Sequence, residues 1–433
     1  MSDLSAYDSK GLKVRAVLLL VILFAFFFAW VSIKWQLADM LAMLTQPADP
    51  NAAAIAELSA KWAPGDPSAH YLSAASADDP SVSIQSYEQA VRVAPNDYRW
   101  RVELARAYAQ DEQTVTAERE FKRAVELAPS YAQPHWYLGN FFLRRGRDAE
   151  AIAEFKKAAA KNHIYRDQVF SLAWDYFDKD PLQLEDLADG RPDALAHLAF
   201  FFAARGRAAE SIRTWNKLGE NEKPRYASTA KGIAAGLMDQ RHFPQALEFA
   251  QQLGFAADTK PEAVTNPSFE RNFGERNFGE RDFGEAEDSR FDWQIWRTEP
   301  KMDIAVDNRV KHQGNQSLRV VFKNYSKSSI ANISQNIVVQ PNTKYRLTFW
   351  LMTENLKSLG LPLIEIFNPS DNKPIARSQP FPVGTTGWQQ VTIDFITPEN
   401  CDGITLRTNR NSCGEECQLT GTFWYDDFEI GRG

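Results

Sequence analysis

Apolar and aromatic residues recur in the first half of the chain with a fixed period. Tyr87, Phe121 and Phe155 are spaced 34 residues apart. Small residues keep the same spacing in a second register, at Ala90, Ala124 and Ala158. This spacing predicts helical hairpins, in which small residues let two helices approach and aromatic rings fill the space between hairpins. One hairpin cannot bury its own apolar face, so we predict about five of them stacked over residues 55–256.

The two middle units carry the fullest pattern. The first consists of Leu104, Ala105, Tyr108, Ala117, Phe121, Ala124 and a closing Pro129. The second consists of Leu138, Gly139, Phe142, Ala151, Phe155 and Ala158, with His163 in place of the closing proline. This pattern closely resembles the tetratricopeptide repeat (TPR) family. The resemblance implies an all-α solenoid whose concave groove, lined by the first helices, holds a protein partner.

The N-terminal region contains one uninterrupted apolar run. Residues 16–33 carry no charge and are rich in Leu, Val and Phe. This run is about long enough to cross the hydrocarbon core of a membrane, which predicts a transmembrane helix. A cleaved signal peptide is the alternative, but its apolar core normally spans about 7–15 residues and precedes a small-residue cleavage site. Here Lys34 and Trp35 follow directly.

The charges beside the run predict its orientation. Three cations precede it, at Lys10, Lys13 and Arg15, whereas Lys34 is the only cation between the run and Lys61. Because cytoplasmic flanks carry the excess of Lys and Arg, we expect residues 1–15 in the cytoplasm. A linker, residues 34–54, and nearly the whole chain then lie across the membrane. In a bacterium with an outer membrane, this is a single-pass inner-membrane protein with its bulk in the periplasm.

From about Ala263 the helical period gives way to short alternating segments. They are 317–322, 345–351, 389–395 and 421–430, and turn residues such as Gln340-Pro-Asn and Gly384-Thr-Thr-Gly separate them. Alternation with regular turns predicts an antiparallel all-β sandwich over residues 257–433. The fold class is therefore multidomain: a transmembrane helix, an all-α solenoid and an all-β sandwich.

The order of motifs in this second half is also informative. It runs Asn266-Pro-Ser-Phe-Glu270, Phe291-Asp-Trp293, Gly314-Asn-Gln-Ser-Leu318, Val339-Gln-Pro-Asn-Thr-Lys-Tyr345 and Trp424-Tyr-Asp-Asp-Phe-Glu-Ile430. Residues 263–431 resemble the carbohydrate-binding-module jelly rolls of the galactose-binding-like superfamily, especially families 4 and 9. The resemblance implies a polysaccharide ligand, although this architecture also serves protein contacts and pure structure.

The same resemblance implies a structural calcium ion that joins the first and last strands. Its ligands would be Glu270 and Asp426, with Asp427 as the other candidate. Alternation favours Asp426, because it shares parity with Trp424, Phe428 and Ile430 and is expected to point inward. An unpaired carboxylate would be costly there, and calcium would neutralise it. The alternative is a buried aspartate satisfied by backbone donors or an arginine.

Sugar rings stack on aromatic side chains, and their hydroxyls bind polar groups nearby. Trp296 and Trp388 are our candidate ligand-binding residues. Phe381 is a further candidate, whereas Trp293, Trp350 and Trp424 lie in core motifs or strands and are expected to pack. Between the Phe-Glu and Phe-Asp-Trp motifs, an Asn/Asp-Phe-Gly-Glu unit is repeated in tandem. Its cancelling charges and glycines predict a flexible solvated loop, residues 271–285.

All three cysteines lie near the C-terminus, which fits an oxidising compartment. Cys413 and Cys417 are expected to form a disulfide that closes a small loop. Cys401 is then left over, either buried and free or paired with Cys417 instead. A zinc site would need a fourth ligand close by, and the last histidine is His312.

Charge and motifs exclude several functions. A formal net charge of −7 without a basic stripe argues against nucleic acid. The chain has no nucleophile elbow, phosphate loop, zinc-protease motif or dinucleotide-binding glycines. Together with what the two family resemblances imply, this leads us to expect a non-enzymatic scaffold in cell-surface polysaccharide export or assembly. The alternatives are a protein-only assembly factor and a glycan-processing enzyme, whose two carboxylates no linear pattern would reveal.

Overall fold

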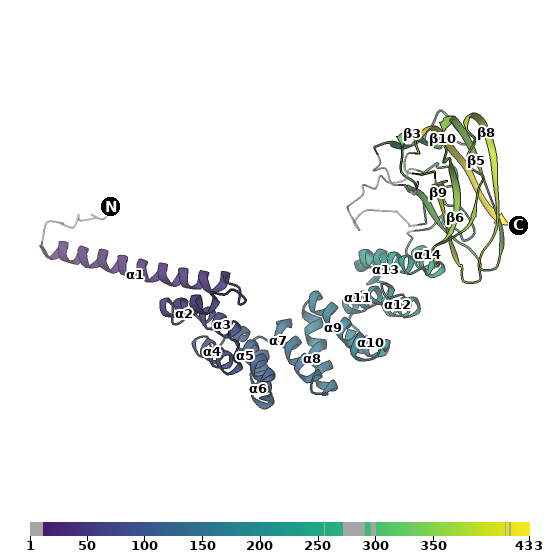
Figure 1. The fold of residues 1–433 in the computed structure, drawn as a ribbon. Helices are drawn as coiled ribbons and strands as arrows, with labels where there is room; N and C mark the ends of the chain where they lie inside the picture. The colour runs from purple at the N-terminus through teal and green to yellow at the C-terminus, as the bar shows by residue number, and fades with distance from the viewer. Residues whose placement is uncertain are drawn as a thin grey trace, which may run out of the picture. The chain divides into compact units, whose positions relative to one another are not determined.

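The computed structural model describes residues 12–254, 256–271, 291–295, 300–330, 332–411, 413–414 and 417–433, with only the backbone for 12–14. Contacts divide the chain into two compact units, Met1–Asp189 and Gly190–Gly433 (Figure 1). The first unit is helical. The second contains further helices and the β-sandwich. The predicted all-α repeat region and all-β sandwich are confirmed.

The first unit begins with a long apolar helix, α1 (Leu12–Leu44). Nine further helices follow: α2 (Ala52–Trp62), α3 (Pro67–Ala75), α4 (Pro80–Val93), α5 (Tyr98–Gln110), α6 (Thr114–Leu127), α7 (Ala132–Leu143), α8 (Asp148–Lys161), α9 (His163–Tyr176) and α10 (Pro181–Ala188). Residues 34–44, which the sequence suggests as linker, continue α1 as helix. Arg15–Leu44 is the described segment long and apolar enough to cross a membrane, or to be a signal sequence.

Aspartates set the start of several of these helices. The side chains of Asp66, Asp79 and Asp180 each accept a hydrogen bond from the backbone N–H two residues later, and a proline follows each aspartate at the first helical position. An N-cap acceptor satisfies one of the free N–H groups of a helix start, and proline has the matching φ. Short connections with these caps produce the up-and-down hairpins.

The repeat registers lie where the period predicts. Tyr87, Phe121 and Phe155 are buried, and the three alanines of the second register are completely buried. Gly139 is tightly constrained, because a Cβ built on it would lie 2.7 Å from the ring of Phe155. The small residues therefore do let the hairpin helices α7 and α8 approach closely.

The second unit opens with the remaining helices. These are α11 (Pro192–Ala203), α12 (Ala208–Trp215), the 3₁₀ turn η1 (Lys223–Tyr226), α13 (Ala227–Asp239) and α14 (Phe243–Gln252). Helix α14 contacts the sandwich at strand β4 (Ile333–Val338). A Cβ built on Gly403 would lie 2.3 Å from the ring of Phe243, so this ring is packed directly on the backbone of the sheet. By contacts, the last helices thus belong with the sandwich.

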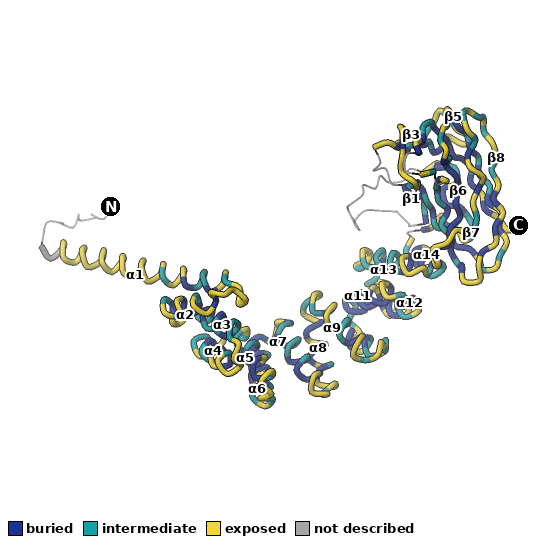
Figure 2. The backbone as a smooth tube through the Cα atoms, in the orientation of Figure 1, coloured by how far each residue is buried: buried dark blue, intermediate teal, exposed yellow. Residues whose placement is uncertain are grey.

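The sandwich consists of two antiparallel five-stranded sheets. The first sheet has the order β1-β4-β9-β6-β7, with β1 (Gln294–Ile295), β9 (Gly403–Arg410), β6 (Pro362–Asn368) and β7 (Lys373–Arg377). The second has the order β2-β3-β10-β5-β8, with β2 (Met302–Asp307), β3 (Ser317–Tyr325), β10 (Leu419–Arg432), β5 (Lys344–Lys357) and β8 (Gly384–Ile396). Figure 2 shows buried positions alternating with exposed ones along the strands, as expected where two sheets enclose a core.

A bulge in the last strand changes which side chains enter this core. Phe423 and Tyr425 belong to the core cluster, and so do Phe428 and Ile430, although the two pairs differ in parity. The register of β10 against β5 shifts between Asp426 and Glu429, and Asp427 has a positive φ of 51°. Trp424 and Asp426 therefore lie on the outer face of the second sheet, opposite to the side that simple alternation predicts.

Candidate functional site: the polar face of the first sheet

A buried carboxylate organises the outer face of the first sheet. Glu365 is the central residue of β6, and the registers place it opposite Arg377 on one side and Arg407 on the other. Its Oε1 accepts from the Arg377 Nε at 2.8 Å, and its Oε2 accepts from the Arg407 Nε at 2.7 Å. Asn409 donates to the same Oε2 at 3.2 Å. We call these four residues the Glu365 cluster.

Glu365 remains ionised although it is only 1% exposed. Burial raises the pKa of its carboxyl, but hydrogen bonds from Arg407 and Arg377 outweigh this effect, so the pKa lies below its usual value of 4.5. The guanidinium groups remain accessible, with side-chain exposures of 55% for Arg377 and 28% for Arg407. A buried anion thus holds two partly exposed arginine side chains in fixed positions.

An aromatic ring and further polar groups continue this face. The guanidinium carbon of Arg407 lies 3.9 Å from the ring centroid of Phe367, the next outward residue on β6. On the neighbouring strands, Thr405 donates to Asn336 at 2.8 Å. The face therefore offers guanidinium, amide and hydroxyl groups in fixed positions, the chemistry that binds sugar hydroxyls.

Sequence reasoning missed the Glu365 cluster. Its signal is present, because a glutamate in the middle of the otherwise apolar strand Pro362–Asn368 must find partners if the strand is covered. The partners lie on strands that are distant in sequence, and no linear pattern shows that Arg377 and Arg407 flank Glu365.

The predicted ligand-binding tryptophans belong to different sheets. Trp296 lies outside the described residues, immediately after β1, which is an edge strand of the first sheet. Trp388 lies on β8, an edge strand of the second sheet. It is half-buried, and its ring lies edge-to-face with that of His312 at 5.8 Å between centroids. Phe381, the further candidate, is 1% exposed and packs in the core.

The other tryptophans have packing roles, as expected, though not all in the core. Trp293 belongs to the core cluster. Trp424 is buried on the outer face of the second sheet, where its Nε1 donates to Asp307 at 3.1 Å. Trp350 lies on the same outer face and is covered by His312, with 3.8 Å between the ring centroids.

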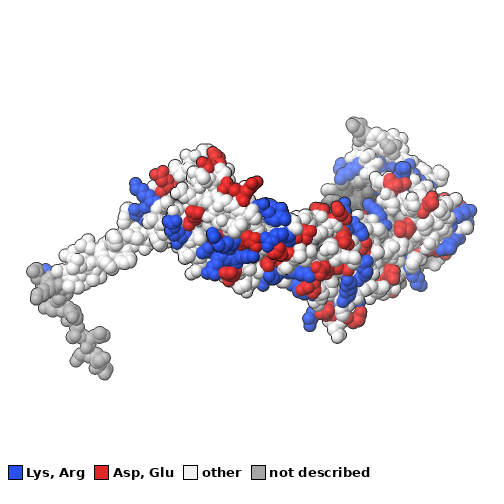
Figure 3. Space-filling view, turned by 90° about the horizontal axis from the view of Figure 1, so that it is seen from below, with Lys and Arg blue, Asp and Glu red and all other residues white. Residues whose placement is uncertain are grey.

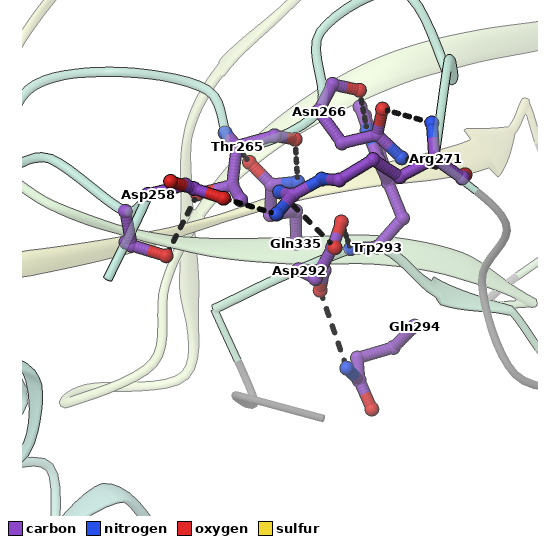
Figure 4. A network of polar contacts seen from close by, with 9 residues as sticks. Asp258, Thr265, Asn266, Arg271, Asp292, Trp293, Gln294 and Gln335 are labelled. Atoms are coloured by element: carbon purple, nitrogen blue, oxygen red, sulfur yellow. Dashed lines mark hydrogen bonds and ion pairs between the residues drawn. The ribbon is translucent and has the colours of Figure 1, made fainter. Parts of the chain in front are cut away.

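A polar network holds the entry segment of the sandwich in place (Figure 4). Gln335 exchanges two hydrogen bonds with the backbone of Thr265 across the start of the domain. Trp293 donates from Nε1 to the carbonyl of Asn266 at 3.0 Å, and Asn266 in turn exchanges hydrogen bonds with the backbone of Arg271. The first two motifs noted above, at residues 266–270 and 291–293, are therefore joined in one network. Its role is to fix the segment that carries Glu270.

The three predicted calcium ligands, Glu270, Asp426 and Asp427, lie around the loop 308–316. Each of them contacts hydrogen-bonding groups of this loop. Asp426 is fully buried, and its Oδ2 accepts from the backbone N–H groups of His312 at 2.8 Å and Gln313 at 3.3 Å. Burial raises the pKa of Asp426 to about 6, with the neighbouring Asp427 adding to the rise, against the effect of these donors. This is the arrangement of a buried aspartate satisfied by backbone groups.

The other two carboxylates are also occupied. Asp427 accepts from Ser268 Oγ at 2.6 Å and lies 2.6 Å from His312 Nδ1. Glu270 accepts from the backbone and side chain of Asn315 at 2.6 and 3.0 Å. Among the described residues, no three His, Cys, Asp or Glu side chains form a group that could hold a metal ion. As arranged, these three carboxylates do not fit a shared calcium ion, because N–H and O–H donors take the place of a cation.

The cysteines lie at opposite ends of strand β9, because Cys401 precedes the strand and Cys413 and Cys417 follow it. Cys413 and Cys417 are joined as a disulfide, and Cys401 is buried with a free thiol. Burial raises the pKa of the Cys401 thiol to about 11, so it is held as an unreactive thiol. Arg410 lies beside the disulfide and donates to the carbonyl of Cys417 and the hydroxyl of Ser358.

In the helical unit, aromatic side chains on α5, α7 and α9, and Tyr131 just before α7, contact one another. Tyr131, 59% exposed, lies 5.4 Å from Tyr98 between ring centroids. The guanidinium of Arg106 lies 5.2 Å from the ring of Tyr137, and the rings of Trp136 and Tyr165 lie 6.0 Å apart. These contacts join successive repeats. Partly exposed Tyr and Arg side chains are frequent anchors in protein interfaces.

Comparisons with known proteins agree with both halves of the chain. A family described as a carbohydrate binding domain matches residues 262–412, and a tetratricopeptide repeat family matches residues 68–132 and 116–163. No curated protein matches the chain.

Several solved structures are similar to parts of the chain. A xylan-degrading enzyme module pair of Clostridium thermocellum is 14% identical, covers 40% of this chain and 29% of its own, and has a TM-score of 0.25. A structure described as CBM4 is 12% identical and covers 39% of this chain and 99% of its own, with a TM-score of 0.28. The MamA protein is 18% identical and covers 41% and 85%, with a TM-score of 0.20. The chain thus carries tetratricopeptide repeats followed by a carbohydrate-binding domain of the family 4 and 9 group.

Proposed function

We propose that this protein is a membrane-anchored scaffold that holds a protein partner with its repeats and a glycan with its sandwich. The apolar part of α1 would anchor it in a bacterial inner membrane, with the bulk of the chain in the periplasm. Such a protein would bring a polysaccharide to the machinery that exports or assembles it. The repeat family supports the protein partner, and the carbohydrate-binding family supports the glycan.

The Glu365 cluster is the observation that carries the glycan proposal. A buried charge is costly, and replacing it with apolar packing often leaves a fold as stable. A sandwich that needed only stability would gain little from this anion, whereas a binding face gains donor groups held in fixed directions. The partly exposed Arg377 and Arg407 would donate to sugar hydroxyls, and the neighbouring Asn409 would add an amide. Trp296, which follows β1 in the sequence and lies outside the described residues, remains our candidate for a stacking ring.

The same geometry argues against glycan hydrolysis at this face. A glycosidase needs one carboxyl with a raised pKa to protonate the leaving group, and a second carboxylate opposite it. The two guanidinium groups instead lower the pKa of Glu365. The cluster is therefore arranged to bind and not to donate a proton.

The experiment is affinity electrophoresis of the full chain, in mild detergent, through gels containing bacterial and plant polysaccharides. We expect one or more of the polymers to retard the protein. Arg377→Ala should reduce this retardation at least several-fold. The matched control is Arg346→Ala, because Arg346 is similarly exposed, at 57%, and is also paired with a carboxylate, but lies on the second sheet.

One further variant, Trp388→Ala, locates the site. Retardation that survives Arg377→Ala but is lost in Trp388→Ala would move the glycan site to the second sheet, where our sequence-based candidate lies. The absence of retardation by every polymer, with a folded protein, would favour the protein-only assembly factor. In that case the partner should be sought by crosslinking at Tyr131, the most exposed ring of the repeat face.

A further inference from the structure

The apolar helix α1 is longer than a membrane core requires. Arg15–Leu44 comprises 30 residues, which at 1.5 Å per residue span about 45 Å. A hydrocarbon core of about 30 Å takes about 20 of them. Counted from Arg15, the core would end near Trp35. The remaining residues of α1 belong to the water-facing side, without any break in the helix.

The connection between α2 and α3 lies beside α1 near Trp35, where the membrane core would end. Helix α2 runs back along α1, and the buried Ala42 of α1 belongs to one cluster with Ala52 and Ala56 of α2. At its end, the ring of Trp62 lies 5.8 Å from Lys34 Nζ. The next turn, residues 63–66, is also close to α1, because a Cβ built on Gly65 would lie 3.5 Å from the ring of Trp35.

A hydrogen bond fixes the following helix at the same height. Ser68, in the first turn of α3, donates from Oγ to Asp39 on α1 at 3.2 Å. The α2–α3 turn is therefore held against residues 34–39 of α1, directly beyond the end of the apolar run. Trp62 before the turn and Ser68 after it both contact α1, and these contacts set the position of the turn along that helix.

The side chains at this level are those that prefer the membrane interface. Trp35 is 50% exposed and Leu37 is 41% exposed, while Trp62 is half-buried. Lys34 and Lys61 flank these rings. Trp is enriched at the headgroup level, and Lys extends its ammonium group to the phosphates there. In Figure 3 the apolar run of α1, residues 16–33, carries no acidic or basic side chain, whereas charges of both signs lie over the helices beyond it.

We propose that the α2–α3 turn, together with Trp35, Leu37 and Trp62, lies in the lipid headgroup region and binds the bilayer surface. The inference rests on the membrane anchoring proposed above. In this arrangement the first hairpin of the solenoid contacts lipid. The repeats then begin at the membrane surface and are not separated from it by a flexible linker. Lipid is favoured over a second copy of the chain because the surface continues directly from the apolar run.

The test is photocrosslinking in phospholipid nanodiscs with the full chain. A benzophenone amino acid is placed at one of four sites: Leu23 within the apolar run, Leu37, Trp62, and Met43 near the end of α1. Met43 is the matched control, because it is 67% exposed on the same helix but about 9 Å farther along than Leu37. We expect lipid adducts at Leu23, Leu37 and Trp62, and at least a five-fold lower yield at Met43.

Each other outcome has a separate meaning. Lipid adducts at Leu23 alone would overturn the interface proposal and leave the anchor standing. The absence of adducts at Leu23 as well would overturn the anchor itself. Protein–protein adducts at Leu37 or Trp62, in place of lipid adducts, would assign this surface to a second copy. To separate misfolding from lost contact, the repeats of each variant are checked by circular dichroism.

Discussion

The imidazole of His312 stacks on the indole of Trp350, with 3.8 Å between the ring centroids and 15° between the ring planes. The same histidine donates its backbone N–H to the buried Asp426, and its Nδ1 lies 2.6 Å from Asp427. One residue thus joins the loop 308–316 to the last strand and to the outer face of the second sheet.

His312→Ala should therefore destabilise the sandwich. The substitution removes the stacked ring and the contact with Asp427, while the backbone N–H to Asp426 remains. We expect a loss of about 1–3 kcal/mol in the free energy of unfolding, measured by urea denaturation followed through tryptophan fluorescence. Gln313→Ala is the control, because the exposed side chain of Gln313 makes no comparable contact, and it should change the stability by less than about 0.5 kcal/mol. Equal effects of both substitutions would contradict the role of the ring.

Calcium should have little effect on the same domain. Donors already satisfy Glu270, Asp426 and Asp427, so a cation would have to displace several hydrogen bonds to bind. We expect the melting temperature in millimolar calcium to equal that in excess chelator within about 1 °C. A calcium-dependent rise that Glu270→Gln abolishes would restore the calcium site that the family resemblance implies, by showing that the loop rearranges around the ion.

The stability of the sandwich should fall in acid through Glu365. Its carboxyl has a lower pKa in the folded chain than its usual value of 4.5, so the folded state favours the ionised form. The resulting stabilisation is complete above this usual value and is lost as the pH falls through the lower folded value. Unfolding in urea between pH 7 and pH 3 would measure this loss.

Glu365→Gln should remove that dependence. It should also cost about 2–4 kcal/mol at pH 7, because Arg407 and Arg377 lose their shared anion. Asp394→Asn is the control, since Asp394 pairs with Arg346 at an exposed position, where an ion pair contributes little. A pH profile of Glu365→Gln identical to that of the parent would show that other carboxylates cause the acid loss.

Gly139→Ala should destabilise the repeats by overpacking. The added methyl group would lie 2.7 Å from the ring of Phe155, and a core that must shift to admit a methyl group loses about 1–3 kcal/mol. Phe155→Leu in the same chain should recover part of this loss, because the smaller side chain leaves room. A double-mutant cycle by thermal unfolding measures the coupling, and strictly additive effects would show that the two residues do not meet.

The repeats were the most predictable part of the molecule. Their packing is local, and each unit repeats the same contacts, so the period alone identifies Phe121 and Phe155 as buried. The sandwich was predictable as a fold, but the sequence did not predict which side chains of each strand point into the core. Alternation placed Asp426 with the core residues, and the bulge at Asp427 reversed that assignment. A bulge is set by the partner strands, which the local sequence does not contain.

The candidate site illustrates the same limit. Trp388 is identifiable from the sequence as an aromatic residue next to a predicted strand, but not as a neighbour of His312. Glu365 was visible as a charge in an apolar strand, but its partners come from β7 and β9. Site residues drawn from non-adjacent strands require the register of the sheet, and a single sequence does not fix that register.

Finally, the contact of Phe243 with Gly403 affects how this protein can be divided for experiments. A fragment that starts at residue 257, where the sequence suggests a domain boundary, would remove this ring and leave an apolar hollow over strand β9. Exposed hollows of this kind promote aggregation. A fragment for expression should instead begin near Gly190, where the second compact unit begins. Expression of residues 190–433 should therefore yield soluble sandwich more readily than the shorter fragment.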